Sequence, residues 1–149
     1  MVQIIDKLST VHENKPSTVT TALLYKKKIY LSQRIGSIRF NERWQGAGGK
    51  LNDGEHPLIG AQREVFEETG LYIDTNRFVH ISEILDHPST KCCTIYYVQL
   101  NDNEIPENRE AKTKYFPQAS DWHLFSFENA EELFLMPSLM KVLDILKNL

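Results

Sequence analysis

The sequence predicts a mixed α/β sandwich, in which strands and interspersed helices share one compact domain over residues 1–149. Three observations predict it. Several short segments are rich in β-branched or alternating apolar residues, which is typical of strands. Two longer segments instead carry apolar residues at helical spacing. The chain of 149 residues also has the length of one ordinary domain.

The first part of the chain predicts a hairpin followed by loops. The apolar and β-branched run Thr18–Tyr25 and the run Ile29–Ser32 flank three lysines, which suit a solvated hairpin tip. The polar stretch Arg34–Arg43 predicts an exposed loop. The segment Trp44–Leu51 is dense in glycine, and the next residues, Asn52-Asp53-Gly54, predict a turn.

A helix is predicted over residues 58–69, between Pro57 and Gly70. Proline suits the first turn of a helix, and glycine suits the residue just past its end. The apolar residues that recur at helical spacing, and that we expect to be buried, are Leu58, Ala61 and Val65.

The second part of the chain returns to strands and ends in helices. Alternating apolar residues predict strands over Phe78–Leu85, Thr94–Leu100 and Trp122–Phe127. The polar stretch Asn101–Pro117 predicts a long loop of poor order. The predicted helices are Glu128–Leu133 and Pro137–Leu149.

Composition argues against several classes of protein. A net charge of −3 is unlike that of a general nucleic-acid binder, although a bound cation would let the chain accept a small phosphorylated ligand. No apolar run approaches the ~18–20 residues of a membrane span, and the N-terminal residues do not resemble a signal peptide. The adjacent Cys92 and Cys93 fit reduced thiols in a half-buried strand. We therefore expect a cytoplasmic protein without a membrane partner.

An acidic cluster is the most informative feature of the sequence. Glu64, Glu67 and Glu68 lie at positions i, i+3 and i+4, so their carboxylates project from one face of the predicted helix. Two such charges ~5 Å apart repel by roughly 3 kcal/mol at an effective dielectric near 20. A divalent cation between them reverses the sign of that interaction. The alternative is a solvated helix face, but the preceding glycine turn and Glu55 favour a site for a hard cation, Mg²⁺ first and Mn²⁺ as its substitute.

The spacing of these residues resembles a known motif. The pattern Gly49-x5-Glu55-x7-Arg63-Glu64-Val65-x-Glu67-Glu68-x-Gly70-Leu71 looks like the complete Nudix box, over residues 49–71. The resemblance implies a Nudix-type α/β/α sandwich with a mixed central sheet. It also implies hydrolysis of a nucleoside diphosphate linked to another group, by attack of water on phosphorus.

The resemblance further implies a role for each residue of the motif. Glu67 and Glu68 would ligate Mg²⁺, with Glu64 as a further ligand or as the general base. The carbonyl of Gly48 would complete the metal site, and Lys50 would face the substrate phosphates. Glu55 and Arg63 would orient the helix and its carboxylates. In many relatives a later loop supplies another carboxylate, for which the candidates are Glu104, Glu107 and Glu110.

The residues before the box point to a substrate class. Trp44–Leu51 is similar to the corresponding stretch of MutT-like nucleoside triphosphate pyrophosphatases, including those that remove oxidised purines, although Ala47 replaces their usual Pro or bulkier residue. The expected reaction converts a (d)NTP into its monophosphate and pyrophosphate. The candidate residues for holding base and phosphate are Arg34, Phe40, Trp44, Asp121 and Trp122.

Other functions are compatible with the same motif. ADP-ribose, sugar nucleotides and RNA caps are alternative substrates within the family. A nucleotide-sensing module without catalysis is a different class of function, which the intact set of glutamates disfavours. The family resemblance also makes a homodimer an expectation, with a small-molecule nucleotide as ligand and no stable nucleic-acid binding.

Overall fold

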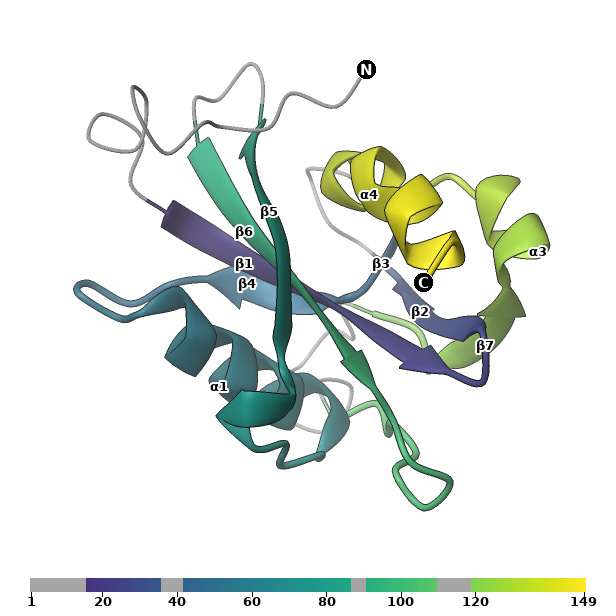
Figure 1. Ribbon diagram of the computed structural model, residues 1–149, viewed down its shortest axis with the longest axis horizontal. Coiled ribbons are helices and arrows are strands. Elements are labelled where there is room, and N and C mark those ends of the chain that lie inside the picture. Colours follow the sequence, from purple (N-terminus) through teal and green to yellow (C-terminus); the bar gives the residue numbers. More distant parts are fainter. Residues whose placement is uncertain (1–15, 36–41, 87–90, 110–118) are drawn as a thin grey trace.

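The computed structural model describes residues 16–35, 42–86, 91–109 and 119–149. A seven-stranded sheet separates helix α1 on one side from α3 and α4 on the other, so the predicted mixed α/β fold is confirmed (Figure 1). The strands are β1 (Pro16–Tyr25), β2 (Lys28–Gln33), β3 (Trp44–Gln45), β4 (Ala47–Lys50), β5 (Val79–Asp86), β6 (Lys91–Gln99) and β7 (His123–Ser126). The helices are α1 (Pro57–Thr69), the 3₁₀ turn η1 (Thr75–Arg77), α3 (Phe127–Glu131) and α4 (Pro137–Lys147).

The central strand β1 organises both layers of the core. It runs parallel to β6 and antiparallel to β2 and β4, and the main path of the sheet is β3-β2-β1-β6-β5. Successive residues of a strand point to opposite faces, so Leu23 packs in the layer under α1 and Leu24 in the layer under α4. Both faces are covered. Because helices cover both faces of the sheet, Cys92 and Cys93 are both buried in β6, as reduced thiols, rather than lying in a half-buried strand.

The predicted hairpin is confirmed, with a tighter tip than expected. Lys28 belongs to β2, and the turn consists of Lys26 and Lys27, whose φ angles are 46° and 61°. Two consecutive left-handed residues match the turn that best suits the twist of a two-residue hairpin, although asparagine and glycine adopt it at lower cost than lysine.

The glycine-dense segment forms two short strands, β3 and β4, that alternation of apolar residues does not predict. Gly48 pairs with Thr20 of β1. A Cβ at position 48 would collide with the carbonyl oxygen of Val19. Glycine is therefore needed for β4 to lie this close to β1, and the strand depends on this absence of a side chain rather than on a pattern of apolar residues.

Helix α1 begins and ends where the sequence predicts. Pro57 is its first residue, and the Nδ1 atom of His56 accepts a hydrogen bond of 3.1 Å from the Leu58 N–H. Gly70 ends the helix with φ 79°, and its N–H donates to the Phe66 carbonyl at 2.9 Å. The predicted stripe packs on the sheet: Ala61 and Val65 are buried, and Leu58 is partly buried.

The remaining elements differ from the prediction mainly at their ends. β6 starts three residues early, at Lys91, and β7 stops at Ser126 because the Ser126 hydroxyl caps α3, accepting 3.1 Å from the Asn129 N–H. The last helix ends at Lys147. Within the part of the chain that the structure describes, no helix has the length and apolarity needed to cross a membrane.

Candidate active site

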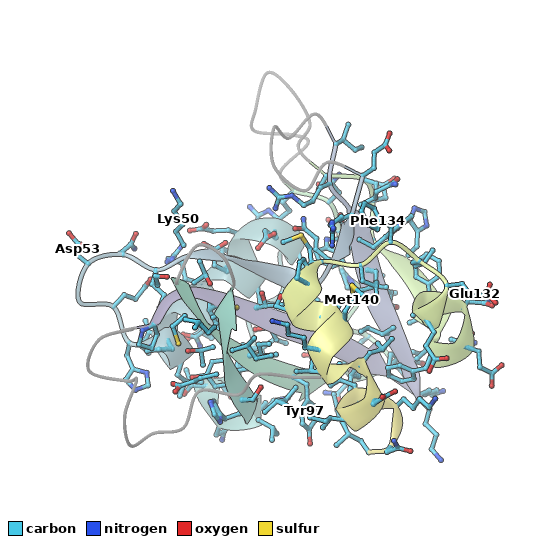
Figure 2. All side chains as sticks on the ribbon, turned by 90° about the horizontal axis from the view of Figure 1, so that it is seen from above. Lys50, Asp53, Tyr97, Glu132, Phe134 and Met140 are labelled. Carbon is cyan, nitrogen blue, oxygen red and sulfur yellow. The ribbon has the colours of Figure 1, made fainter. Side chains whose placement is uncertain are left out.

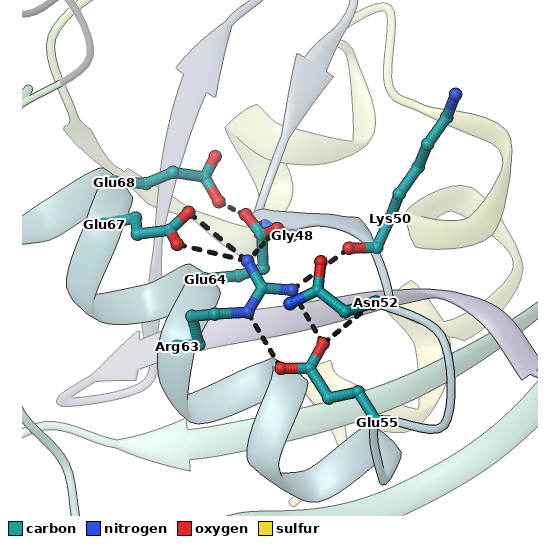
Figure 3. A network of polar contacts seen from close by, with 8 residues as sticks. All are labelled: Gly48, Lys50, Asn52, Glu55, Arg63, Glu64, Glu67 and Glu68. Atoms are coloured by element: carbon teal, nitrogen blue, oxygen red, sulfur yellow. Dashed lines mark hydrogen bonds and ion pairs between the residues drawn. The ribbon is translucent and has the colours of Figure 1, made fainter.

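The acidic face of α1 lies against β4, and Figure 3 shows its carboxylates over Gly48. The Glu68 side chain is buried, and its Oε2 accepts a 2.8 Å hydrogen bond from the Gly48 N–H. The Glu68 carboxylate therefore faces β4 rather than solvent. A carboxylate can be buried here because a backbone donor on β4 satisfies it.

Glu64 lies one turn earlier and packs against the next glycine. A Cβ at Gly49 would stand 2.8 Å from Glu64 Oε1, so the carboxylate occupies space that a side chain at position 49 would take. Burial raises the pKa of Glu64, while hydrogen bonds with Glu68 and Arg63 oppose the rise. The backbone of β4 thus forms a cradle for two carboxylates.

Arg63 ties the acidic residues together. Its guanidinium donates to both carboxylate oxygens of Glu55, at 2.9 and 2.8 Å, and to Glu64 and Glu67 at 3.0 and 3.1 Å (Figure 3). It also donates to the Lys50 carbonyl at 3.1 Å. The bidentate pair with Glu55 adds the base of the preceding loop to the network that joins Arg63 to the helix carboxylates.

The ion pair between Arg63 and Glu55 shifts the pKa values of the two groups in opposite directions. Hydrogen bonding from Arg63 lowers the pKa of Glu55 to about 2, and the Asn52 N–H, which donates to Glu55 at 3.0 Å, acts in the same direction. The same bond raises the pKa of Arg63. Glu55 is therefore a permanent anion at neutral pH, and it holds the guanidinium in place for the other carboxylates.

The possible ligand atoms on the acidic face of α1 fit a hard divalent cation. Glu64, Glu67 and Glu68 offer only carboxylate oxygens, which Mg²⁺ and Mn²⁺ prefer. Among residues 16–35, 42–86, 91–109 and 119–149, no three acidic, histidine or cysteine side chains already converge on one point. Glu67 is 52% exposed and contacts Arg63, so it has room to turn toward its neighbours. Gly48 presents its N–H to Glu68, and the role of its carbonyl stays a prediction.

The described candidates for a carboxylate from the later loop are Glu104 and Glu107, and Glu104 is already in an ion pair. Glu104 forms a bidentate ion pair with Arg77, 2.7 Å at each oxygen, which lowers the pKa of Glu104. Glu107 donates its backbone N–H to the Thr69 carbonyl at 3.0 Å, at the end of α1, and its side chain is exposed. Residues 101–109 are thus held by specific bonds, against the predicted poor order, and Glu110 lies outside the described residues.

A cleft of about 310 Å³ adjoins the acidic face across β4. Strand β1, strand β4 and the start of α4 form its walls, and Arg34 lines it while donating 3.1 Å to the side-chain oxygen of Gln45. Lys50 also lines the cleft, and its side chain extends away from the carboxylate network (Figure 3). Figure 2 shows Lys50 projecting at the surface, far from Glu132 at the α3 end.

The predicted base-binding residues occupy different places. Arg34 lines the cleft. Trp44 packs edge-on against Phe125, with ring centroids 5.1 Å apart, in the layer under α4. Trp122 packs in the layer under α1, and Asp121 is exposed. Phe40 lies outside the described residues, and the binding roles of all five stay predictions.

Sequence reasoning missed part of the cleft. Gln45 lies in Trp44–Leu51, the stretch that resembles MutT-like enzymes. Met136, Pro137 and Ser138, at the start of α4, carry no sequence signal beyond that of a helix start. They reach the cleft because the Trp44 N–H donates to Phe134 and the Met136 N–H donates to Trp44, both at 2.8 Å. These bonds connect residues about 90 positions apart, which local spacing does not reveal.

Known proteins resemble this chain in sequence and in fold. A family model described as the NUDIX domain matches residues 15–143. An oxidized purine nucleoside triphosphate hydrolase of Mus musculus is 36% identical over 76 residues, which cover 50% of this chain and 49% of that protein. An RNA pyrophosphohydrolase of Bartonella clarridgeiae is 33% identical over 52 residues, covering 32% of this chain and 30% of that protein. The matches therefore span half or less of either curated relative.

The fold likeness extends over most of the chain. A crystal structure of a MutT NUDIX hydrolase from Burkholderia pseudomallei superposes with a TM-score of 0.71 and 18% sequence identity. The superposition covers 88% of this chain and 98% of that one. At this identity the likeness concerns the arrangement of helices and strands alone.

Proposed function

Because the chain belongs to the Nudix family, we propose that it hydrolyses a nucleoside triphosphate, with Mg²⁺ or Mn²⁺ as cofactor, to the monophosphate and pyrophosphate. The observation that carries this proposal is the wall shared by the cleft and the acidic face. Gly48 and Gly49 line the cleft on one side and contact Glu68 and Glu64 on the other. A nucleotide held in the cleft can therefore extend its phosphates over β4 toward the carboxylates.

Each residue of the site contributes by binding or orientation. Glu64, Glu67 and Glu68 would hold the divalent cation, with Glu64 alternatively serving as the general base. Such a cation, when bound, supplies positive charge that neutralises phosphate oxygens and activates water. Lys50 and Arg34, which line the cleft, add cationic side chains for the phosphates. Arg63 orients Glu64 and Glu67, and Glu55 orients Arg63.

The substrate class rests on the cleft and on one relative. The mouse protein that matches half of this chain is named for oxidised purine nucleoside triphosphates, which makes these compounds the first to test. The Bartonella relative is named for RNA pyrophosphate removal, so a 5′-triphosphate on RNA is the second candidate. Organisation as a single domain, a cytoplasmic location, a homodimer and the absence of stable nucleic-acid binding stay predictions.

A hydrolysis screen tests this function. Purified chain with Mg²⁺ is incubated with NTPs, dNTPs, 8-oxo-dGTP, ADP-ribose, sugar nucleotides, capped RNA and 5′-triphosphate RNA, and the products are identified by chromatography. We expect pyrophosphate release from a free nucleoside triphosphate. Activity confined to diphosphate-linked compounds or to RNA would contradict the proposed substrate.

Two variants connect the activity with the carboxylates. Glu68→Gln or Glu67→Gln should lower turnover by about 100-fold or more, because a ligand oxygen loses its charge while the side-chain shape is kept. Glu131→Gln is the matched control, since Glu131 pairs with Lys147 on the opposite layer. Near-normal rates in Glu67→Gln and Glu68→Gln would show that the metal assignment is wrong.

A further inference from the structure

The last turn of α1 carries Glu68, one of the candidate site residues. The last four carbonyls of an α-helix have no partner within the helix, and the final turn frays unless other groups cap it. Glu68 is the next-to-last residue of α1, whereas Glu64 lies one turn inside it. The place of the Glu68 carboxylate therefore depends on what holds its own backbone.

Three donors from a distant part of the chain hold the last two carbonyls of α1. The indole N–H of Trp122 donates to the Glu68 carbonyl at 3.3 Å, and the Arg109 N–H donates to the same oxygen at 3.4 Å. The Glu107 N–H donates to the Thr69 carbonyl at 3.0 Å. Glu68 is thus held from both ends: its carboxylate by Gly48 of β4, and its carbonyl by residues far beyond the box.

The donors are themselves fixed to the sheet. Just before Trp122, the Ser120 N–H donates to the Gln33 carbonyl, and the Gln33 N–H donates to the Ser120 hydroxyl, both at 2.8 Å. The segment that precedes Glu107 is fixed by the bidentate pair of Arg77 and Glu104. Because hydrogen bonds join the neighbouring Ser120 to Gln33 of β2, the Trp122 N–H holds the end of α1 in place relative to the sheet.

We infer that Trp122 is a positioning residue for Glu68, setting the affinity of the site for its divalent cation through the Glu68 carbonyl rather than by touching the reacting atoms. This inference rests on the proposed function, in which Glu68 holds the cation. It also assigns Trp122 a role apart from base stacking. Since Trp122 and Trp44 are the only tryptophans of the sequence, replacing Trp44 leaves Trp122 as a reporter of the site.

The test uses the full chain and the metal alone, without nucleotide, so that any role in base binding does not contribute. Mn²⁺ binding is measured by electron paramagnetic resonance of the free ion for wild type, Trp122→Phe, Trp44→Phe and Glu68→Gln. Losing one hydrogen bond predicts about fivefold weaker binding in Trp122→Phe. Trp44→Phe should bind as wild type does, and the emission of its remaining Trp122 should change on addition of Mg²⁺.

The outcomes separate this inference from the proposed function. Suppose that Glu68→Gln weakens Mn²⁺ binding, but the Mn²⁺ affinity of Trp122→Phe stays within twofold of wild type and Trp122 emission does not change with Mg²⁺. The positioning role of Trp122 is then wrong, and the metal assignment stands. If Glu68→Gln binds Mn²⁺ like wild type, Glu68 is not a ligand and both fail.

A second variant separates the hydrogen bond from packing. Benzothienylalanine at position 122, in the Trp44→Phe chain, keeps the shape of the indole and replaces its N–H by sulfur. We expect it to bind Mn²⁺ as weakly as Trp122→Phe. Wild-type affinity in this variant would mean that the ring acts only by filling space, which would overturn the inference.

Discussion

The two ends of α1 are held in different ways. At its start, the stabilising groups are neighbours in sequence: His56 caps the Leu58 N–H, and Glu55 closes the turn at Asn52. At its end, apart from Gly70, the donors come from Glu107, Arg109 and Trp122. The start of the helix is specified locally, whereas the end is specified by the tertiary structure.

This difference separates two tasks of one helix. Glu55, before the helix, and Arg63, in its middle, form a charged network that orients carboxylates, and each carboxylate partner lies within about two turns of Arg63. The end carries Glu68 and requires a folded sheet to hold it. Variants at the two ends should therefore change the stability of different parts of α1. We give the expected effects from the largest to the smallest.

Arg63→Ala should have the largest effect. It leaves the carboxylates of Glu55, Glu64 and Glu67 without the guanidinium that they share. We expect the free energy of unfolding to fall by about 2 kcal/mol and the activity to fall about 100-fold. Urea unfolding followed by circular dichroism measures the first quantity. Lys147→Ala, which removes an exposed ion pair with Glu131, is the control and should leave the free energy of unfolding close to that of wild type. Equal losses in both variants would contradict the network.

Acid should weaken the start of the helix. The pKa of Glu55 is about 2 in the folded protein against an ordinary 4.5, so the unfolded chain binds more protons between these values. The stabilisation by Glu55 is complete above pH 4.5 and is lost as pH falls toward 2. The difference in unfolding free energy between wild type and Glu55→Gln should shrink over that range. A difference independent of pH would show that the Glu55 carboxylate is not stabilised by Arg63.

Arg77→Ala should loosen the end of α1 and spare its start. Glu104 loses its bidentate partner, and we expect a cost of about 1 kcal/mol. Hydrogen exchange measured by mass spectrometry should show lower protection in the last turn of α1 and in residues 104–109. Protection of the first turn should stay as in wild type. Loss of protection at both ends alike would show that the two ends of α1 are not held independently.

His56→Ala should give the smallest and most local effect. Loss of the cap at Leu58 is expected to cost about 0.5–1 kcal/mol, and His56→Asp should retain the cap because aspartate is a strong capping residue. Exchange protection should fall in the first turn alone. Unchanged stability in His56→Ala would mean that the proline and the turn before it suffice.

The parts of the site that could be predicted are those whose partners lie close in sequence. Pro57, Gly70 and the spacing of the glutamates indicated the helix, its limits and the face that carries the carboxylates. The burial of Glu68 could not be predicted, because it depends on Gly48 approaching from a strand that apolar alternation does not reveal. The cleft was equally hidden, since its wall at Met136–Ser138 is brought to β3 by backbone bonds across the chain.

The shared wall at Gly48 also limits how this protein can change over evolution. Its backbone serves the cleft and the acidic face, and any side chain there meets the Val19 carbonyl. A mutation at this position would therefore disturb the cleft wall and the hydrogen bond to Glu68 together. Under the proposed function, recognition of a different nucleotide would instead change at residues across the cleft, such as Met136, Pro137 and Ser138 at the start of α4. Under that proposal, side chains across the cleft can change while Gly48 and the two carboxylates beside β4 are kept.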